Sequence, residues 1–589
     1  MQWDRELDVV VVGSGLGALT SAVCLKELGV ESVEVIEKAE RFGGTSAVSG
    51  GGIWIPNNHY AKACGATDSV DDARAYLAST IEEGTVPEEL IETYIQQAPA
   101  MLKFVTERAK EVGYISLEHY PDYYMQNPGA RAGHRSLEPM PINHDELGDD
   151  MNKLQSTHHM LYLYDRIGMT QVEGHDLVTR SKGWMGVMAK LMLTYASETF
   201  WRMKHKTKRS RRLSCGSAGV ARMYLAARKR NVAVTLNTAL EELVQDNIGR
   251  VIGIKAKENG RDVYIKARKG VVLGSGGFEY NQELREKYLP KPTSTEWSGG
   301  NIRTNTGDAL LACLKLGAKT RLMNGAWWCT TISAPDEPAP RLAIMEKSLP
   351  GSCVVNMAGK RIANESQNYM AYQTEFFQSH SDDNPNAPAY MVFDKRFRNS
   401  YLVGPLLDVQ SRPDFRLPKS YFENGFMAKE DSIDSLAQKL GIDQAGLNNT
   451  ITQMNAYAKT GKDPEFQRGD TEYDRYYGDA TVTPNPCLHA IDEGPFYAVR
   501  IDPGDFGTHG GMDTSVNAQV LSEATGKPIE GLYAIGNCAA AILPTYPGPG
   551  STLGPAMTFG YQAAKHIASQ SASVDKSDDK VTKEEAVPA

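Results

Sequence analysis

Residues 8–18, DVVVVGSGLGA, are the stretch of sequence that decides the fold class. Four consecutive valines are typical of a fully buried parallel strand, and residues 18–28 are predicted to form an amphipathic helix. A second predicted strand, VEVIE at residues 33–37, follows directly. The order of these elements predicts a β-α-β unit, and with it an α/β chain with a Rossmann-like domain.

The glycine turn between the first strand and the helix matches the pattern G-x-G-x-x-G/A. Gly13 permits the tight turn, Gly15 lets the backbone approach a pyrophosphate, and Ala18 permits close packing of helix on strand. The helix N-terminus then faces the phosphate charge. Glu37 ends the second strand, where a carboxylate can accept ribose hydroxyls. A glycine turn without a ligand is the weaker interpretation, so the sequence predicts a dinucleotide site formed by Gly13, Ser14, Gly15, Leu16, Gly17, Ala18 and Glu37.

Elements of the same kind recur far along the chain. Residues 264–273 read as a strand that enters the glycine turn 274–277, and residues 531–537 repeat the strand-to-glycine form before a predicted helix at 554–569. The cofactor domain is therefore expected to be discontinuous, with an inserted α+β substrate domain. The expected divisions are 1–320 and 502–569 for the cofactor domain, 321–501 for the substrate domain, and 570–589 for a polar, disordered tail.

Composition narrows the class of protein. The 589 residues are 41% hydrophobic and 23% charged with a formal charge of -9, which fits a globular enzyme and argues against a nucleic-acid binder. The eight cysteines are widely spaced and form no metal-ligand pattern, so we expect reduced thiols and no metal. With neither a signal-peptide pattern nor a long apolar run, the protein is expected in the cytoplasm.

The segment after the second strand favours FAD over NAD. The stretch EKAERFGGTSA (37–47) followed by SGGG (49–52) resembles the flavoprotein superfamily of fumarate reductases and succinate dehydrogenases, in which an E-K-x-x-x-x-G-G-x-S/T stretch runs along the flavin. Gly536 and Asn537 resemble that superfamily's late A-G-N/D element, which reaches the ribityl chain. The resemblance implies FAD as cofactor and adds to the predicted site Lys38, Gly43, Gly44, Thr45, Ser46, Ser49, Gly50, Gly51, Gly52, Gly276, Gly536, Asn537 and Leu553.

A proline- and glycine-rich segment, TYPGPGS at residues 545–551, is the candidate for the reaction itself. Two prolines and two glycines within five positions fix an unusual backbone directly before a helix. The phenol of Tyr546 and a free backbone N–H could converge there on one oxygen, as in an oxyanion hole. A rigid turn without a substrate role is the alternative interpretation.

The run YPGPGSTLGPAMTFGY (546–561) resembles the T-Y-P-G-P-G-G-T-I-G-P-A-M-T-F-G-Y signature of the 3-ketosteroid Δ1-dehydrogenases, and the similarity covers most of the chain. By that resemblance, the Tyr546 hydroxyl and the Gly550 N–H hold the steroid 3-ketone, Tyr369 removes the proton from carbon 2, and Tyr123 assists Tyr369. Hydride from carbon 1 passes to flavin N5. The implied activity is FAD-dependent 1,2-dehydrogenation of 3-ketosteroids, whose electron acceptor and oligomeric state the sequence does not indicate.

Several alternatives stay open at this level. Tyr124 competes with Tyr123 because strand alternation would turn only one of them inward, and Tyr372 competes with Tyr369 if the segment is helical. His509 is interpreted as a local hydrogen-bonding residue rather than an acid. A 3-ketosteroid Δ4-dehydrogenase or a fumarate-reductase-like enoate reductase is the nearest alternative activity. A peripheral membrane protein that merely retains FAD is the alternative from another class.

The resemblance lapses between about residues 150 and 213. There an apolar stretch (183–193) precedes Phe200-Trp201 and the basic run RMKHKTKRSRR (202–212). Apolar and aromatic residues beside a cationic cluster are what an interfacial membrane anchor requires. The sequence predicts peripheral contact of residues 183–212 with the inner face of the cytoplasmic membrane, and with it sterol-derived ketones such as cholest-4-en-3-one as substrates. An oligomer contact or a solvated lid is the alternative.

Overall fold

The computed structural model describes residues 2–406 and 412–584. A central parallel sheet contains β10 (Ala233–Thr235), β2 (Val33–Ile36), β1 (Arg5–Val12), β13 (Arg261–Leu273) and β23 (Pro528–Ala534), in that spatial order. The predicted β-α-β unit is confirmed, since β1 and β2 pair in parallel around α1 (Leu16–Glu27). Val9, Val10 and Val11 are fully buried, as expected of a strand covered on both faces.

Strands from the two ends of the chain meet in this sheet. Val271 to Leu273 of β13 pair with Leu532 to Ala534 of β23, and α18 (Leu553–Glu584) packs on α1. A Cβ on Gly17 would lie 2.9 Å from the Ala556 carbonyl oxygen, so the small residues of α1 and α18 allow close helix packing. The α/β class and the discontinuous arrangement are confirmed.

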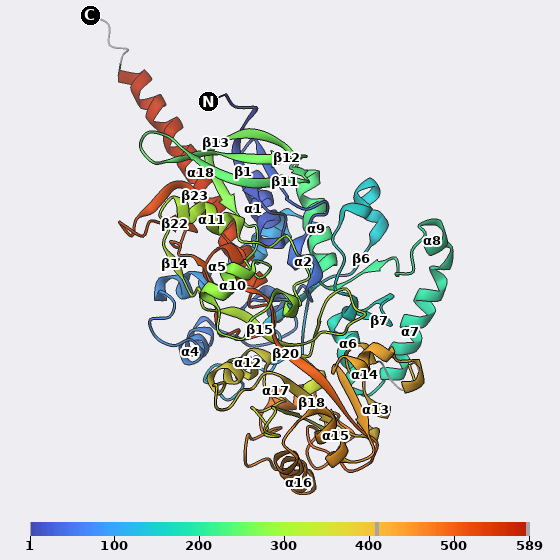
Figure 1. The fold of residues 1–589 in the computed structure, drawn as a ribbon. Helices are drawn as coiled ribbons and strands as arrows, with labels where there is room; N and C mark the ends of the chain where they lie inside the picture. The colour runs from blue at the N-terminus through green and yellow to red at the C-terminus, as the bar shows by residue number, and fades with distance from the viewer. Residues whose placement is uncertain (1, 407–411, 585–589) are drawn as a thin grey trace, which may run out of the picture.

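A second, antiparallel sheet forms the other half of the molecule, in the lower part of Figure 1. Its path is β16 (Arg341–Leu342), β15 (Ala326–Ile332), β20 (Phe496–Thr508), β18 (Ala389–Phe393) and β17 (Ser352–Val355), with β19 (Met427–Glu430) also on β20. β20 is continuous through residues 501 and 502, where the sequence predicts a domain boundary. Its first half pairs with β18 and its second half with β15, and Phe506 near its end lines the cavity described below.

The segment predicted to be an insertion contains α6 (Gln171–Thr179), α7 (Trp184–Ser197) and α8 (Thr199–Lys204). Figure 1 shows α7 and α8 at the edge of the molecule. A small apolar cluster around Leu163, Ile167 and Leu191 holds α7 on the rest of the segment. Among the described residues, no helix is both long and apolar enough to span a bilayer.

The C-terminal helix runs further than the sequence predicts. Disorder is expected from Gln570, whereas α18 continues to Glu584 and points away from the body in Figure 1. Residues 571–584 contain three Ser, three Asp, three Lys and one Glu. A helix already nucleated on α1 can continue into these residues, because adding residues to an existing helix costs far less than nucleating one. Residues 585–589 lie outside the described part of the chain.

Candidate active site

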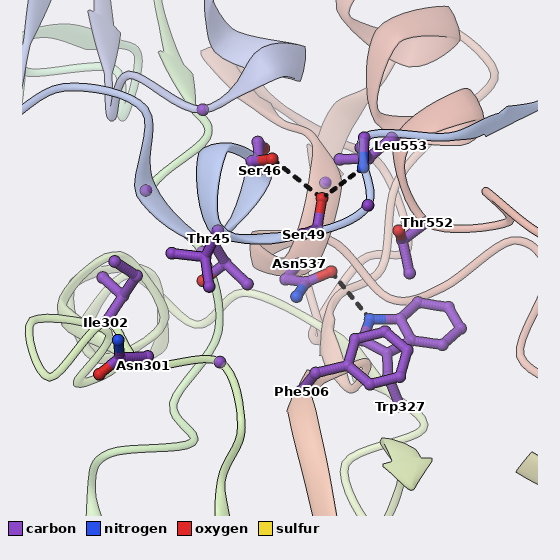
Figure 2. A pocket seen from close by; sticks show the side chains of 18 of the residues that line it. Thr45, Ser46, Ser49, Asn301, Ile302, Trp327, Phe506, Asn537, Thr552 and Leu553 are labelled. Atoms are coloured by element: carbon purple, nitrogen blue, oxygen red, sulfur yellow. Dashed lines mark hydrogen bonds between the residues drawn. The ribbon is translucent and has the colours of Figure 1, made fainter. Parts of the chain in front are cut away.

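One continuous cavity of about 470 Å³ runs from the carboxyl end of β2 to the segment Tyr546–Gly550. Figure 2 shows part of its wall. The predicted site residues that line it are Gly13, Ser14, Gly15, Gly17, Ala18, Glu37, Lys38, Gly44, Thr45, Ser46, Ser49, Gly50, Gly51, Gly52, Tyr123, Gly276, Tyr369, Gly536, Asn537, Tyr546, Gly550 and Leu553. The structure therefore brings segments more than 400 residues apart in sequence into one site.

Two predicted residues lie behind this wall. Leu16 is buried, and its N–H donates to the Ser46 hydroxyl over 3.0 Å. Gly43 has a φ of 116°, which favours glycine, and its N–H donates to the Ser14 hydroxyl over 2.9 Å. Both hold the shape of the cofactor loops without contributing to the cavity surface.

The glycine turn and Glu37 suit a dinucleotide. A Cβ on Gly44 would meet nothing within 4 Å, so open space lies over this residue, whereas a Cβ on Gly15 would meet the Ser46 hydroxyl tightly at 3.2 Å. The Glu37 carboxylate accepts from the Ser14 N–H (3.1 Å) and from the Ala39 N–H (2.8 Å). Burial raises its pKa, and these hydrogen bonds oppose the shift. The Ser14 hydroxyl also donates to the oxygen that accepts from the Ser14 N–H, so the carboxylate is fixed at the cavity wall and its other oxygen keeps one lone pair for a ribose hydroxyl. The residues present thus fit the ADP half of FAD.

Farther along the cavity, β15 and the loop after β23 contribute Trp327 and Asn537. The Trp327 Nε1–H donates to the Asn537 side-chain oxygen over 3.0 Å, as Figure 2 shows. Phe506 of β20 also lines the cavity, with its ring centroid 5.9 Å from that of Tyr546. An indole held by the Asn537 amide gives this part of the cavity a rigid wall.

The Tyr546–Gly550 segment has a strained, closely packed backbone. Tyr546 has a φ of 58°, uncommon for a non-glycine residue, and Gly550 has a φ of 101°. A Cβ on Gly550 would lie 2.5 Å from backbone atoms of Ile53, so only glycine fits. The Trp54 N–H donates to the Gly550 carbonyl over 3.2 Å, and the Tyr76 hydroxyl donates to the Pro547 carbonyl over 2.6 Å. These contacts fix the loop against β3 (Ile53–Trp54).

Three buried tyrosines from three separate segments meet at this end of the cavity. The Tyr123 hydroxyl donates to the Tyr369 hydroxyl over 3.1 Å, and the rings of Tyr369 and Tyr546 are 5.5 Å apart. Burial raises the pKa of Tyr369 well above its usual value, and the hydrogen bond from Tyr123 opposes this. Burial also raises the pKa of Tyr546, while hydrogen bonds from the Tyr369 side chain and the Gly550 backbone act in the opposite direction. The phenol of Tyr546 and the Gly550 N–H thus lie next to each other and beside Tyr369.

Of the adjacent tyrosines Tyr123 and Tyr124, Tyr123 lines the cavity. Tyr124 does not line the cavity, and its hydroxyl donates to the Thr545 carbonyl over 2.7 Å. Tyr123 and Tyr124 lie in a loop, not in the strand that the sequence predicts. A buried triad orients this loop, since the Asp122 carboxylate accepts from the Trp54 indole (2.7 Å) and the Arg135 guanidinium (2.8 Å).

Tyr372 and His509 lie away from the cavity surface. Tyr369 is the first residue of α12 (Tyr369–Gln378), so Tyr372 lies on the same helix, but its buried hydroxyl has no hydrogen-bond partner among the described residues. His509 packs on Trp327 with ring centroids 4.9 Å apart, and burial lowers its pKa to about 3. Within the described chain its Nδ1 has no partner, which differs from the hydrogen-bonding residue expected from the sequence.

Other residues that line the cavity gave no usable signal in the sequence. We call the part of the cavity around Tyr123, Tyr369 and Tyr546 the substrate end. Other residues that line it are Tyr120, Tyr476, Tyr477, Leu342, Ile344, Met345 and, from the predicted insertion, Met160, Met169, Gln171 and His175. Tyrosines are common in ordinary packing, and apolar side chains at the mouth of a pocket do not differ in pattern from core residues. Only the run of glycines and small polar residues at 299–308 could have indicated a loop near the cofactor.

Comparison with known proteins identifies the family. Residues 8–553 match the family described as "FAD binding domain", so the chain is an FAD-binding flavoprotein. It is 39% identical to a 3-oxosteroid 1-dehydrogenase of Mycolicibacterium smegmatis over 97% of this chain and 99% of that protein. It is also 36% identical to a 4-oxocyclohexanecarboxylate 2-dehydrogenase of Sinomonas cyclohexanicum, with 96% and 94% covered.

Among solved structures, the 3-ketosteroid Δ1-dehydrogenase of Sterolibacterium denitrificans in complex with 1,4-androstadiene-3,17-dione is similar throughout. The TM-score is 0.91 and the identity 42%, and the match covers 96% of this chain and 100% of that one. The chain belongs to the FAD-dependent 3-oxosteroid 1-dehydrogenase family.

Proposed function

We propose that this enzyme oxidises 3-ketosteroids by removing hydrogen from carbons 1 and 2 of the A ring. The observation that supports this most directly is the convergence of the Tyr546 hydroxyl and the Gly550 N–H next to Tyr369, in one cavity with the FAD-binding turn. Two donors directed at one acceptor suit a single ketone oxygen. The neighbouring phenol of Tyr369, whose ring lies 5.5 Å from that of Tyr546, supports its role as the group that takes a proton from an adjacent carbon.

Each residue then has a defined task. The Tyr546 hydroxyl and the Gly550 N–H hold the 3-ketone and stabilise the negative charge that develops on its oxygen, which makes the carbon 2 proton more acidic. Tyr369 accepts this proton. Tyr123, 3.1 Å away, stabilises the phenolate form of Tyr369 by donating a hydrogen bond. When bound, FAD supplies the acceptor for the hydride from carbon 1.

The walls of the substrate end favour an apolar ligand over a dicarboxylate. The lysines and arginines that line the cavity within the described chain are Lys38, Arg41 and Arg303. Lys38 and Arg41 belong to the cofactor end, and Arg303 is largely exposed and pairs with Glu296 at 3.6 Å. A fumarate-type enzyme requires a cationic clamp on its substrate carboxylates. The substrate end of the cavity carries thioether, aliphatic and phenol groups instead, which favours a steroid.

The decisive experiment is anaerobic mixing of the holoenzyme with androst-4-ene-3,17-dione, following the loss of oxidised-flavin absorbance and identifying the product. We expect rapid bleaching and androsta-1,4-diene-3,17-dione. A saturated 3-ketosteroid distinguishes a Δ4-dehydrogenase, which would introduce the 4,5-double bond. If no 3-ketosteroid bleaches the flavin, the result favours the alternative of a peripheral membrane protein that merely retains FAD. If 4-oxocyclohexanecarboxylate alone bleaches it, the substrate is a monocyclic ketone.

We also propose that the predicted anchor, residues 183–212, rests on an anionic membrane surface. Large apolar side chains of α7 and α8 are strongly exposed, with fractions of 71% for Leu193, 86% for Phe200 and 69% for Met203. The side chains of Lys190, Lys204, Lys206 and Lys208 are exposed in the same segment. Insertion of the apolar residues and attraction of the lysines to anionic headgroups act together, as in interfacial helices. Met160 and Met169, which precede this anchor within the 150–213 stretch, line the cavity, which suits apolar substrates such as cholest-4-en-3-one.

Sedimentation with phosphatidylglycerol vesicles tests this contact. The triple variant Leu193→Ser, Phe200→Ser, Met203→Ser should leave the pellet fraction, because three exposed apolar side chains are lost without any loss of core packing. Ile248→Ser is the matched control, since Ile248 is 87% exposed in another part of the chain. Unchanged sedimentation of the triple variant would contradict the anchor and favour an oligomer contact.

A further inference from the structure

A strap of residues 299–308, GGNIRTNTGD, crosses the cofactor end of the cavity. All ten of its residues line the cavity, as do Gly13 and Lys38, the latter just after β2. Asn301 and Ile302 lie at the same end of the pocket as Thr45 in Figure 2. Gly299 and Gly300 begin the strap, and Gly307, with a φ of 80°, ends it at the first turn of α11 (Asp308–Lys315). Glycines at both ends allow such a segment to change backbone angles without strain.

The first fastening of the strap is an ion pair to the end of β2. The Lys38 ammonium lies 2.7 Å from the Asp308 carboxylate and donates to the Thr306 hydroxyl over 2.7 Å. The Thr306 hydroxyl in turn donates to the other Asp308 oxygen over 2.7 Å. Lys38 directly follows Glu37, the residue that fits the ribose. The pair therefore bridges the cavity just outside the adenosine end of the cofactor site.

The second fastening is a buried amide. The Asn305 side-chain nitrogen donates to the Thr45 hydroxyl over 3.0 Å and to the Glu279 carboxylate over 2.6 Å. A Cβ on Gly276 would lie 3.0 Å from the Asn305 side chain, so this amide also packs on the glycine turn after β13. Because Asn305 is buried, this second fastening should persist when the partly exposed ion pair breaks.

We propose that Lys38 and Asp308 form a latch that closes the strap over the cofactor site and controls the entry and exit of FAD. This inference goes beyond the proposed steroid activity and rests only on the chain's membership of an FAD-binding family. A latch that must open for passage in either direction slows release and association alike. A lysine that simply held the cofactor by direct contact would slow release and leave association unchanged. The two roles therefore differ in kinetics.

The test uses Lys38→Met, Asp308→Asn and the double variant in the full chain. Release of FAD from the holoenzyme is followed by the rise of free-flavin fluorescence after dilution, and rebinding by its quenching when free FAD is added to the chain stripped of FAD. Each single variant should raise both rates about three- to fivefold, the size expected for a partly exposed ion pair. The double variant should match the single variants, because both substitutions break the same contact.

Lys291→Met is the matched control, since Lys291 forms an exposed ion pair with Glu286 at 2.6 Å that does not border the cavity. It should leave both rates unchanged. The proposal is overturned if Lys38→Met raises only the release rate, if Asp308→Asn has no effect, or if the effects of the two substitutions multiply in the double variant. Because FAD fluorescence needs no substrate, failure of the latch and failure of the steroid assignment are measured separately.

Discussion

Substituting Gly550 by alanine addresses the oxyanion site directly. Gly550 has a φ of 101°, in the left-handed region, where a side chain costs of the order of 1–3 kcal/mol. The new Cβ would lie 2.5 Å from the Ile53 carbonyl carbon and Cα and 2.6 Å from the Gly52 carbonyl carbon, whereas real Cβ atoms essentially never approach within 3.0 Å. The loop must therefore retreat by about 0.5 Å, which moves the N–H away from the ketone oxygen.

Loss of one oxyanion donor lowers the rate of comparable reactions by about 10²–10³. We expect that decrease in the first-order rate of flavin bleaching when Gly550→Ala is mixed anaerobically with androst-4-ene-3,17-dione. Gly29→Ala is the matched control, because Gly29 has a φ of 90° and nothing within 4 Å of its Cβ position. It carries a similar left-handed cost far from the cavity and should bleach at the wild-type rate. Wild-type bleaching by Gly550→Ala, or equal loss in both variants, would refute the reasoning.

The remaining predictions concern the tyrosines and the support beneath them. Tyr369→Phe should slow flavin bleaching by about 10²–10⁴ while steroid binding, followed by perturbation of the flavin spectrum, persists; Tyr372→Phe should be active, and the reverse result would exchange their roles. The bleaching rate should rise with pH as Tyr369 ionises. Because the Tyr123 hydrogen bond lowers the Tyr369 pKa, Tyr123→Phe should move that rise to higher pH, and an unmoved profile would exclude this role. Asp122→Ala leaves the buried Arg135 short of one partner and should lower the free energy of unfolding in urea by about 3–5 kcal/mol. Asp71→Ala, at an exposed pair with Arg74, should have little effect, and equal midpoints for these two variants would contradict the argument.

The sequence by itself determined the features that are encoded in short windows. The valine run, the glycine turn and the carboxylate at the end of β2 specify strand, turn and helix locally, because backbone φ requirements and hydrophobic period act over a few residues. The same is true of the 546–561 run, whose prolines and glycines fix one loop. These windows were enough to predict the cofactor, the α/β class and the family.

Tertiary structure alone decided which side chains meet. Tyr123 and Tyr369 are 246 positions apart and come within 3.1 Å only through the packing of a loop, a helix and the β20 sheet. No local period distinguishes Tyr123 from Tyr124, because the segment is a loop whose direction is set by the buried Asp122, Trp54 and Arg135 contacts. The strap over the cofactor site likewise depends on a lysine and an aspartate 270 positions apart. Contacts between groups far apart in sequence form only when the chain packs, so a short window of sequence does not predict them.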